Sequence, residues 1–117
     1  MSTPLHVLIV EDSENDALLL ARELRRGGYD PVYKQVDTAA ALTSALEQQS
    51  WDIVITDYKM PRLTGVAALE LIKQQQLDLP VIVVSGTIGE EIAVETLKAG
   101  ANDYVMKDNL TRLVPAV

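Results

Sequence analysis

The sequence predicts an open α/β fold, in which a parallel five-stranded sheet carries helices on both faces. Short runs of branched apolar residues alternate with segments of helical periodicity throughout the chain. The connections are short, and right-handed crossovers limit how such units can be wound. The 117 residues suffice for a single domain, 1–117, and are too few for two. The predicted strands cover residues 6–10, 29–36, 52–57, 81–84 and 103–106.

The first strand and helix have clear boundary signals. Residues 6–10 (HVLIV) form an apolar run typical of a buried strand. Ser13 and Asp16 follow with the spacing of an N-terminal capping box, ahead of leucines and alanines at helical spacing. Gly27 and Gly28 end this helix, because glycine readily adopts the conformation that closes a helix.

The second unit begins with an expected edge strand over residues 29–36. Pro31 lies near its start, and proline is tolerated at a sheet edge because it cannot donate a ladder hydrogen bond. Asp37 or Thr38 then caps a helix that runs to about Gln49.

The third strand, residues 52–57, combines a buried pattern with a carboxylate at its end, Asp57. A helix cap is the simplest alternative role for Asp57. Pro61 fixes its own φ and biases the preceding residue toward extended geometry, so the next helix starts at Thr64. Asp57 is too far from that start to cap the helix, which runs to about Gln76.

The last two units are shorter. Residues 81–84 form a strand that ends at Ser85, and residues 90–99 form a helix closed by Gly100 in a left-handed conformation. After the strand at 103–106, Asp108 or Asn109 caps a final helix, which Pro115 interrupts or delays. We expect this helix to be truncated, with more protein following it.

Composition excludes several classes of function. The chain has no cysteine, so disulfides and thiolate metal sites are excluded. No apolar run approaches the ~20 residues of a membrane span and no signal peptide precedes the first strand, so we expect a cytoplasmic location without membrane contact. The net charge of −7 disfavours direct binding of nucleic acid, and the arginines within 22–26 are expected to be solvated helix-end charge.

Polar side chains collect where the predicted strands end. Each has an ordinary alternative role, as a helix-start acid, a turn residue or a solvated charge. In parallel strands, however, carboxyl ends share one edge of the sheet, which is where open α/β sheets bind ligands. The set consists of Glu11, Asp12, Asp57, Ser85 and Lys107.

This mixture of side chains suits phosphoryl chemistry. Three clustered carboxylates repel one another unless a cation joins them, and hard oxygen ligands favour Mg²⁺, with Mn²⁺ as the alternative. A carboxylate can attack phosphorus to give an acyl phosphate. Lys107 and the Ser85 hydroxyl are suited to stabilise the transferred oxygens.

These features together resemble the receiver domain of two-component response regulators, over nearly the whole chain. The motifs that carry the resemblance are Glu11-Asp12 after the first strand, Asp57-x-x-Met60-Pro61 with Gly65, Ser85-Gly86, and the segment 97–107 (LKAGANDYVMK). The resemblance implies a flavodoxin-like, doubly wound sheet of order 2-1-3-4-5, which agrees with the edge position expected for the second strand.

The resemblance also implies roles for residues of the acidic group. Asp57 resembles the phosphoacceptor, which takes its phosphoryl group from a histidine kinase or phosphotransfer protein. Asp12 and Asp57 resemble direct Mg²⁺ ligands, the Lys59 carbonyl a third ligand, and Glu11 a ligand acting through water.

Three further residues resemble the parts that respond to phosphorylation. Lys107 corresponds to the lysine that pairs with phosphoryl oxygens, and Ser85 to the switch hydroxyl. Tyr104 corresponds to the aromatic residue that turns inward, changing the surface of the fourth helix, fifth strand and fifth helix. That surface is expected to control an output domain or effector, whose identity the sequence does not give; a homodimer is an open alternative. For Tyr104 a plain core role is the competing interpretation.

Two positions depart from the family pattern. Asp108 follows Lys107 where the family usually has proline, often after a cis peptide. A trans bond is expected here, which leaves the reach of Lys107 in question. Lys59, two residues after Asp57, is hypothesised to alter the lifetime of the acyl phosphate.

We expect a phosphorylation-controlled signalling module, not an enzyme with an external substrate to turn over. One alternative is an aspartyl-nucleophile phosphatase, which needs an acid where this chain has Lys59. Another is a docking domain that has kept only the fold. A dinucleotide site is disfavoured because acids follow the first strand in place of a glycine loop.

Overall fold

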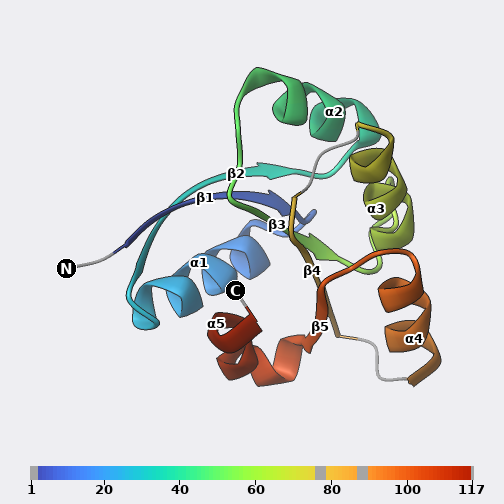
Figure 1. Cartoon of the computed structure of the whole chain (residues 1–117). Helices are drawn as coiled ribbons and strands as arrows, with labels where there is room; N and C mark the ends of the chain where they lie inside the picture. The colour runs from blue at the N-terminus through green and yellow to red at the C-terminus, as the bar shows by residue number, and fades with distance from the viewer. Residues whose placement is uncertain (1–2, 76–78, 87–89, 117) are drawn as a thin grey trace.

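A single parallel sheet of order β2-β1-β3-β4-β5 forms the centre of the molecule (Figure 1). The computed structural model describes residues 3–75, 79–86 and 90–116. This order is the one the resemblance implied, and β2 lies at an edge as Pro31 indicated. The strands are β1 (Thr3–Val10), β2 (Tyr29–Val36), β3 (Ile53–Asp57), β4 (Val81–Ser85) and β5 (Asp103–Met106).

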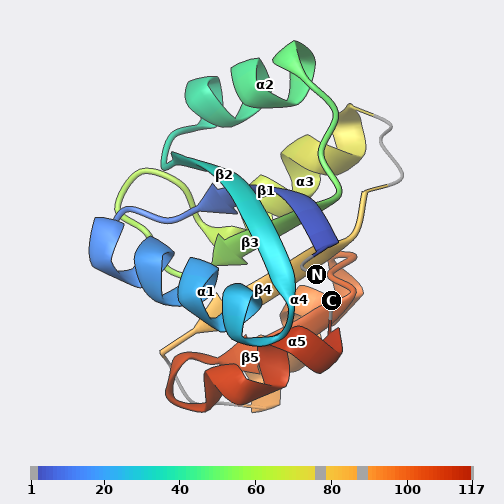
Figure 2. The same ribbon diagram turned by 90° about the vertical axis from the view of Figure 1, so that its left-hand side faces the viewer.

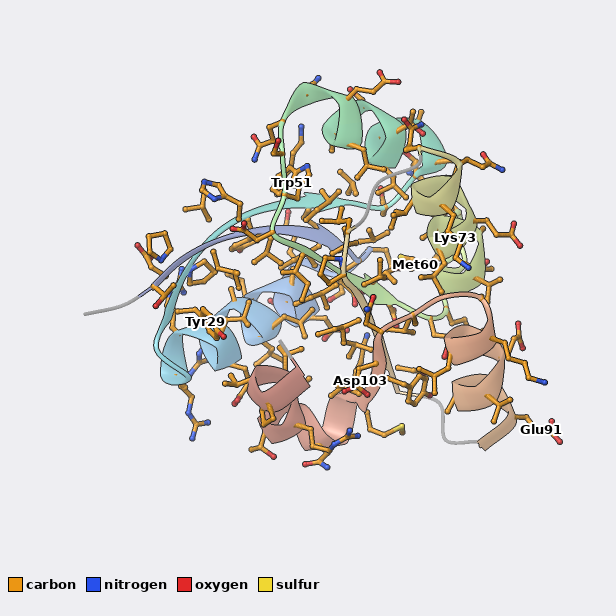
Figure 3. All side chains as sticks on the ribbon, viewed as in Figure 1. Tyr29, Trp51, Met60, Lys73, Glu91 and Asp103 are labelled. Atoms are coloured by element: carbon orange, nitrogen blue, oxygen red, sulfur yellow. The ribbon has the colours of Figure 1, made fainter. Side chains whose placement is uncertain are left out.

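Helices cover both faces of the sheet, as predicted (Figures 1 and 2). One face carries α1 (Glu14–Arg26) and the C-terminal α5 (Leu113–Ala116). The other face carries α2 (Ala39–Gln48), α3 (Gly65–Gln74) and α4 (Glu90–Lys98). At the outer end of α4, the Glu91 side chain points away from the body of the molecule (Figure 3).

The strand residues divide between two apolar cores because successive side chains point to opposite faces of a sheet. Along β1, Val7 and Ile9 pack with α1 and α5, whereas Leu8 and Val10 pack with α2 and α3. The central strand β3 is buried along its whole length, which explains its unbroken apolar pattern.

Side chains of the expected type begin the first three helices. Thr38, not Asp37, caps α2 by accepting a hydrogen bond from Ala41 N at 3.1 Å, and Thr64 caps α3 through Ala67 N at 3.1 Å. Gly100 has a φ of 113°, the left-handed conformation predicted at the end of α4. The predicted end of α3 at Gln76 lies outside the described residues.

The capping box predicted for α1 is only half formed. Ser13 Oγ accepts from Asp16 N at 3.3 Å, as expected. The return bond is missing, because Ser13 N donates to Glu11 Oε1 at 3.2 Å and the Asp16 carboxylate binds elsewhere.

The prediction for the last helix was wrong in its start. Neither Asp108 nor Asn109 begins a regular helix; a 3-10 segment, η1 (Lys107–Arg112), comes first, with a kink at Asn109 (φ −137°, ψ 52°). The chain leaves β5 with Lys107 directed at Asp57 and with Leu110 and Leu113 packed in the core on the α1 face, and the kink at Asn109 separates these two directions. Pro115 falls within the first turn of α5, where its missing N–H costs no hydrogen bond.

Candidate functional site

The register of the strands brings the predicted site residues to one edge of the sheet. Asp57 at the end of β3 pairs with Val84 of β4, and Ser85 pairs with Met106 of β5. Lys107, the next residue of the chain, therefore emerges on the same edge as Asp57. The residues that follow β1 lie on the other side of β3, because β1 is the neighbour of β3 there.

Three carboxylates meet at this edge. Oxygen atoms of Glu11, Asp12 and Asp57 all lie within 4.8 Å of one another. Glu11 and Asp57 are 1% and 7% exposed, whereas Asp12 is exposed at the mouth. Glu11 Oε2 is buried and makes no hydrogen bond of regular geometry among the described residues, but it lies 3.2 Å from the Lys107 ammonium. A donor set made of carboxylate oxygens alone fits a hard divalent cation such as Mg²⁺.

Burial makes the two inner carboxylates reluctant to ionise. Burial raises the pKa of Glu11 to about 7, with the hydrogen bond to Asp12 and the charge of Asp57 adding to the rise. Burial also raises the pKa of Asp57, against the opposing effects of Lys107 and the Tyr58 N–H. A cation at the cluster would favour both ionised forms.

Lys107 places its ammonium among three acids. Its Nζ lies 3.3 Å from Asp57 Oδ2, 3.2 Å from Glu11 Oε2 and 2.7 Å from Asp16 Oδ2. Burial by itself lowers the pKa of Lys107, but these carboxylates outweigh it and the net shift is upward. The described residues contain no cis peptide bond, so the Lys107–Asp108 bond is trans as expected. The trans bond does not prevent Lys107 from reaching Asp57.

Asp16 is the contact that sequence reasoning missed. Its spacing from Ser13 indicated a capping residue, and nothing in the local pattern pointed to Lys107, which lies 91 positions away. The only available signal was that Asp16 is the fourth acid within the six residues that follow the first strand.

The remaining predicted residues lie around this group. Ser85 is 1% exposed at the end of β4, the strand that pairs with β3. Tyr104 is 9% exposed and already packs inward, in the core shared with α2 and α3. Lys59 is exposed in the loop after β3.

The loop after β3 holds Asp57 in place. Tyr58 N donates to Asp57 Oδ1 at 2.9 Å, and Gly65 N donates to Tyr58 O at 2.7 Å, which ties the loop to the start of α3. Met60, 5% exposed, inserts its side chain into the core next to α3 (Figure 3). The orientation of the Asp57 carboxylate is therefore fixed by the core below it.

An acidic crevice at the point where a 2-1-3-4-5 sheet changes winding direction defines a flavodoxin-like α/β domain with its site at the switch point. The chain belongs to the response regulator receiver domain family, whose model matches residues 7–117. It is therefore a receiver domain of the two-component type, a signalling domain, and its acidic pocket is compatible with aspartate phosphorylation and Mg²⁺.

Two curated relatives illustrate the similarity. The transcriptional regulatory protein PrrA of Mycobacterium tuberculosis is 38% identical over 101 residues, covering 86% of this chain and 42% of that protein. The alkaline phosphatase synthesis transcriptional regulatory protein PhoP of Bacillus subtilis is 34% identical over 110 residues, covering 94% and 45%. The chain thus spans less than half the length of these relatives.

Solved structures share the fold. FixJ-N superimposes with a TM-score of 0.81 at 30% identity, covering 96% of this chain and 89% of that one. The receiver domain of the sensor histidine kinase PA1611 from Pseudomonas aeruginosa, solved with a magnesium ion in its active-site cleft, has a TM-score of 0.75 at 24% identity, covering 96% and 95%. Among the described residues, no helix combines the length and the apolar character needed to cross a membrane.

Proposed function

We propose that Asp57 accepts a phosphoryl group from a histidine kinase or a phosphotransfer protein. The observation that carries the proposal is a buried carboxylate within 4.8 Å of two other acids and 3.3 Å from a lysine ammonium. In the transfer, an Asp57 oxygen forms the new P–O bond, the P–N bond of the phosphohistidine breaks, and its electron pair returns to the imidazole.

We assign the divalent cation to the acidic cluster. Asp12 and Asp57 are proposed as direct Mg²⁺ ligands, the Lys59 carbonyl as a third, and Glu11 as a ligand through water; Mn²⁺ would fit the same oxygens. When bound, the ion neutralises charge on the transferring oxygens and lets an anionic donor approach. The all-carboxylate donor set supports this assignment.

The protein's own residues then have distinct roles. Lys107 turns from its carboxylate partners to the phosphoryl oxygens, and Ser85 donates its hydroxyl to the same group. Phosphorylation adds close to two negative charges, which bias the Ser85 and Tyr104 region toward a second arrangement. The altered surface of α4, β5 and α5 is proposed to signal to an output domain or effector, and pairing of two copies through that surface is a further prediction.

Intact mass spectrometry after incubation with acetyl phosphate and Mg²⁺ tests the acceptor. Wild type should gain one phosphate, and Asp57→Asn should gain none. Phosphate on Asp57→Asn would assign a different acceptor, and no phosphate on wild type would leave a docking domain with a retained fold. Steady turnover of a simple phosphate ester would instead indicate a phosphatase, which the exposed Lys59 at the position of the required acid disfavours.

A further inference from the structure

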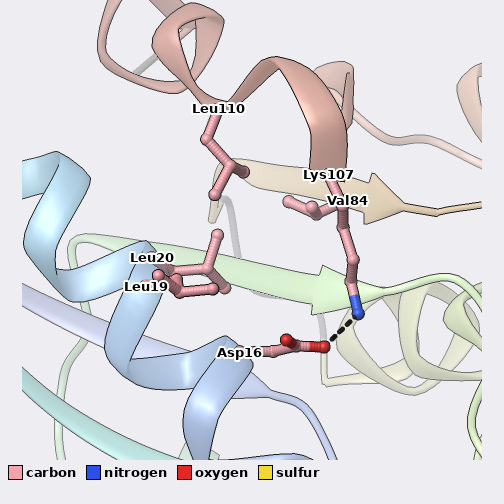
Figure 4. A pocket seen from close by; sticks show the side chains of 6 residues that line it. All are labelled: Asp16, Leu19, Leu20, Val84, Lys107 and Leu110. Carbon is pink, nitrogen blue, oxygen red and sulfur yellow. Dashed lines mark hydrogen bonds and ion pairs between the residues drawn. The ribbon is translucent and has the colours of Figure 1, made fainter.

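The shortest contact of the Lys107 ammonium is with a residue outside the acidic cluster. Its Nζ lies 2.7 Å from Asp16 Oδ2, against 3.2 Å from Glu11 and 3.3 Å from Asp57. Figure 4 shows Lys107 extending toward the first turn of α1 to meet the Asp16 carboxylate. The ammonium is therefore shared between the acceptor and a helix that takes no part in the cluster.

The Asp16 carboxylate can bind Lys107 because the Ser13 N–H, its expected partner in a capping box, donates to Glu11. In a complete capping box it would accept from Ser13 N. Here Ser13 N donates to Glu11 Oε1 instead, at 3.2 Å. Asp16 keeps only its backbone contribution to the cap, and its side chain binds Lys107.

The surroundings strengthen this ion pair. The pocket beside it is lined by apolar side chains of α1, β4 and η1, namely Leu19, Leu20, Val84 and Leu110 (Figure 4). The side chains of Lys107 and Asp16 are 27% and 36% exposed, so water and salt reach the pair only in part. Such a pair is stronger than an exposed surface ion pair, yet it stays sensitive to ionic strength.

We propose that Asp16 restrains phosphorylation of this receiver domain by competing with the phosphoryl group for Lys107. The proposal rests on the role of Asp57 proposed above. An anchoring role is disfavoured, because Lys107 would keep Glu11 and Asp57 as partners without Asp16. What Asp16 adds is a further negative charge, 2.7 Å from the Lys107 ammonium, with which the incoming phosphoryl group must compete.

The test compares phosphorylation rates of wild type and Asp16→Asn with acetyl phosphate, at saturating Mg²⁺ for each variant. Removing the Asp16 charge, which lies 2.7 Å from the Lys107 ammonium, should raise the rate constant of phosphorylation about threefold to tenfold. Asp16→Glu should restore the slower rate. The gain in Asp16→Asn should shrink as sodium chloride rises, because the pair is partly exposed.

Glu14→Gln is the matched control. Glu14 is an exposed acid in the same first turn of α1, so this variant removes the same charge from the helix without touching Lys107. It should phosphorylate at the wild-type rate. An equal gain in Glu14→Gln would mean that general charge, not competition for Lys107, sets the rate.

A second background separates competition from other effects. In Lys107→Met, phosphorylation should be slow and Asp16→Asn should no longer change it.

A metal-free readout is exchange of the Lys107 ammonium protons with water by NMR, which should be faster in Asp16→Asn because one hydrogen-bond acceptor is gone. An unchanged or slower phosphorylation rate in Asp16→Asn would overturn the inference, although phosphate on Asp57 would still stand. Absence of phosphate on wild type would instead overturn the proposed function.

Discussion

At the scale of single residues, the site buries carboxylates whose ionised forms are disfavoured away from water. Glu11 and Asp57 are almost fully buried, and among the described residues Lys107 is the only cation within salt-bridge distance of them. The nucleophilic role proposed for Asp57 requires an ionised carboxylate, yet burial favours the protonated form. Lys107 and the Tyr58 N–H counter this effect at Asp57, whereas Glu11 has a pKa of about 7.

The Glu11 pKa predicts how the stability of the metal-free protein depends on pH. Folding raises this pKa from 4.5 to about 7, so the folded state binds more protons than the unfolded state between these values. Stability should therefore fall as pH rises from about 4.5 to 7, by up to about 3 kcal/mol from this residue. Urea denaturation in EDTA at a series of pH values measures it.

Glu11→Gln is the control for this pH dependence, since it cannot ionise. Its stability should decline less over the same pH range than that of wild type. Parallel curves for the two proteins would mean that Glu11 does not titrate in this range.

Lys59 is the second residue whose effect can be measured. It is exposed in the loop after β3, where its charge can shield an acyl phosphate on Asp57 from water. Lys59→Ala should lose phosphate from Asp57 about twofold to fivefold faster, the size of a contact between exposed charges. Dephosphorylation is followed by intact mass, with Lys59→Arg expected to resemble wild type. Equal rates for wild type and Lys59→Ala would remove the hypothesis.

At this scale the sequence predicted the residues of the acidic cluster but not all of their contacts. Glu11, Asp57, Ser85 and Lys107 could be placed together because parallel strands share one carboxyl edge. Asp16 could not, because its freedom depends on Glu11 Oε1 accepting from Ser13 N, a contact that only the folded site defines.

At the scale of elements, the close packing of α3 against the loop after β3 is the critical feature. A Cβ on Gly65, the first residue of α3, would lie 2.9 Å from Asp57 O and 2.9 Å from Tyr58 Cα. Both neighbours are backbone atoms of the segment that orients the Asp57 carboxylate, so they cannot yield without moving it.

Gly65→Ala should therefore impair both folding and phosphorylation. Overpacking of this kind costs about 1–3 kcal/mol, and the displaced loop should also slow phosphate uptake by Asp57. Urea denaturation and the acetyl phosphate assay measure the two effects. Gly86→Ala serves as a control for stability, because its nearest contact would be Lys107 Cδ at an ordinary 3.8 Å. Equal stabilities of the two variants would contradict the role given to Gly65.

Elements with strong local signals were predicted well. β2 and β5 match the expected ranges, and Thr38 and Thr64 cap the helices that follow them. The C-terminal segment was mispredicted because its structure depends on tertiary contacts, with Lys107 held at the acidic cluster and Leu110 and Leu113 packed in the core. Local capping residues could not reveal those contacts.

At the scale of the whole molecule, topology creates the site. Only the edge position of β2 could be derived from the residues; the complete strand order came from the family resemblance and was confirmed. That order places β1 and β3 side by side, and so brings Asp12 within reach of Asp57. The net charge of −7 adds a general attraction for cations.

Magnesium should therefore stabilise the whole domain. An ion that binds only the folded state adds about 2.7 kcal/mol when its concentration is one hundred times its Kd. For a domain of this size, this corresponds to a rise in Tm of roughly 10 °C. Thermal unfolding with Mg²⁺ and with EDTA, at constant ionic strength, measures the shift.

Asp12→Asn should be more stable than wild type in EDTA, because it removes one of three mutually repelling carboxylates, yet it should lose most of the response to Mg²⁺. An undiminished response in Asp12→Asn would place the ion elsewhere on this acidic protein, since only binding between the two strand ends requires that carboxylate.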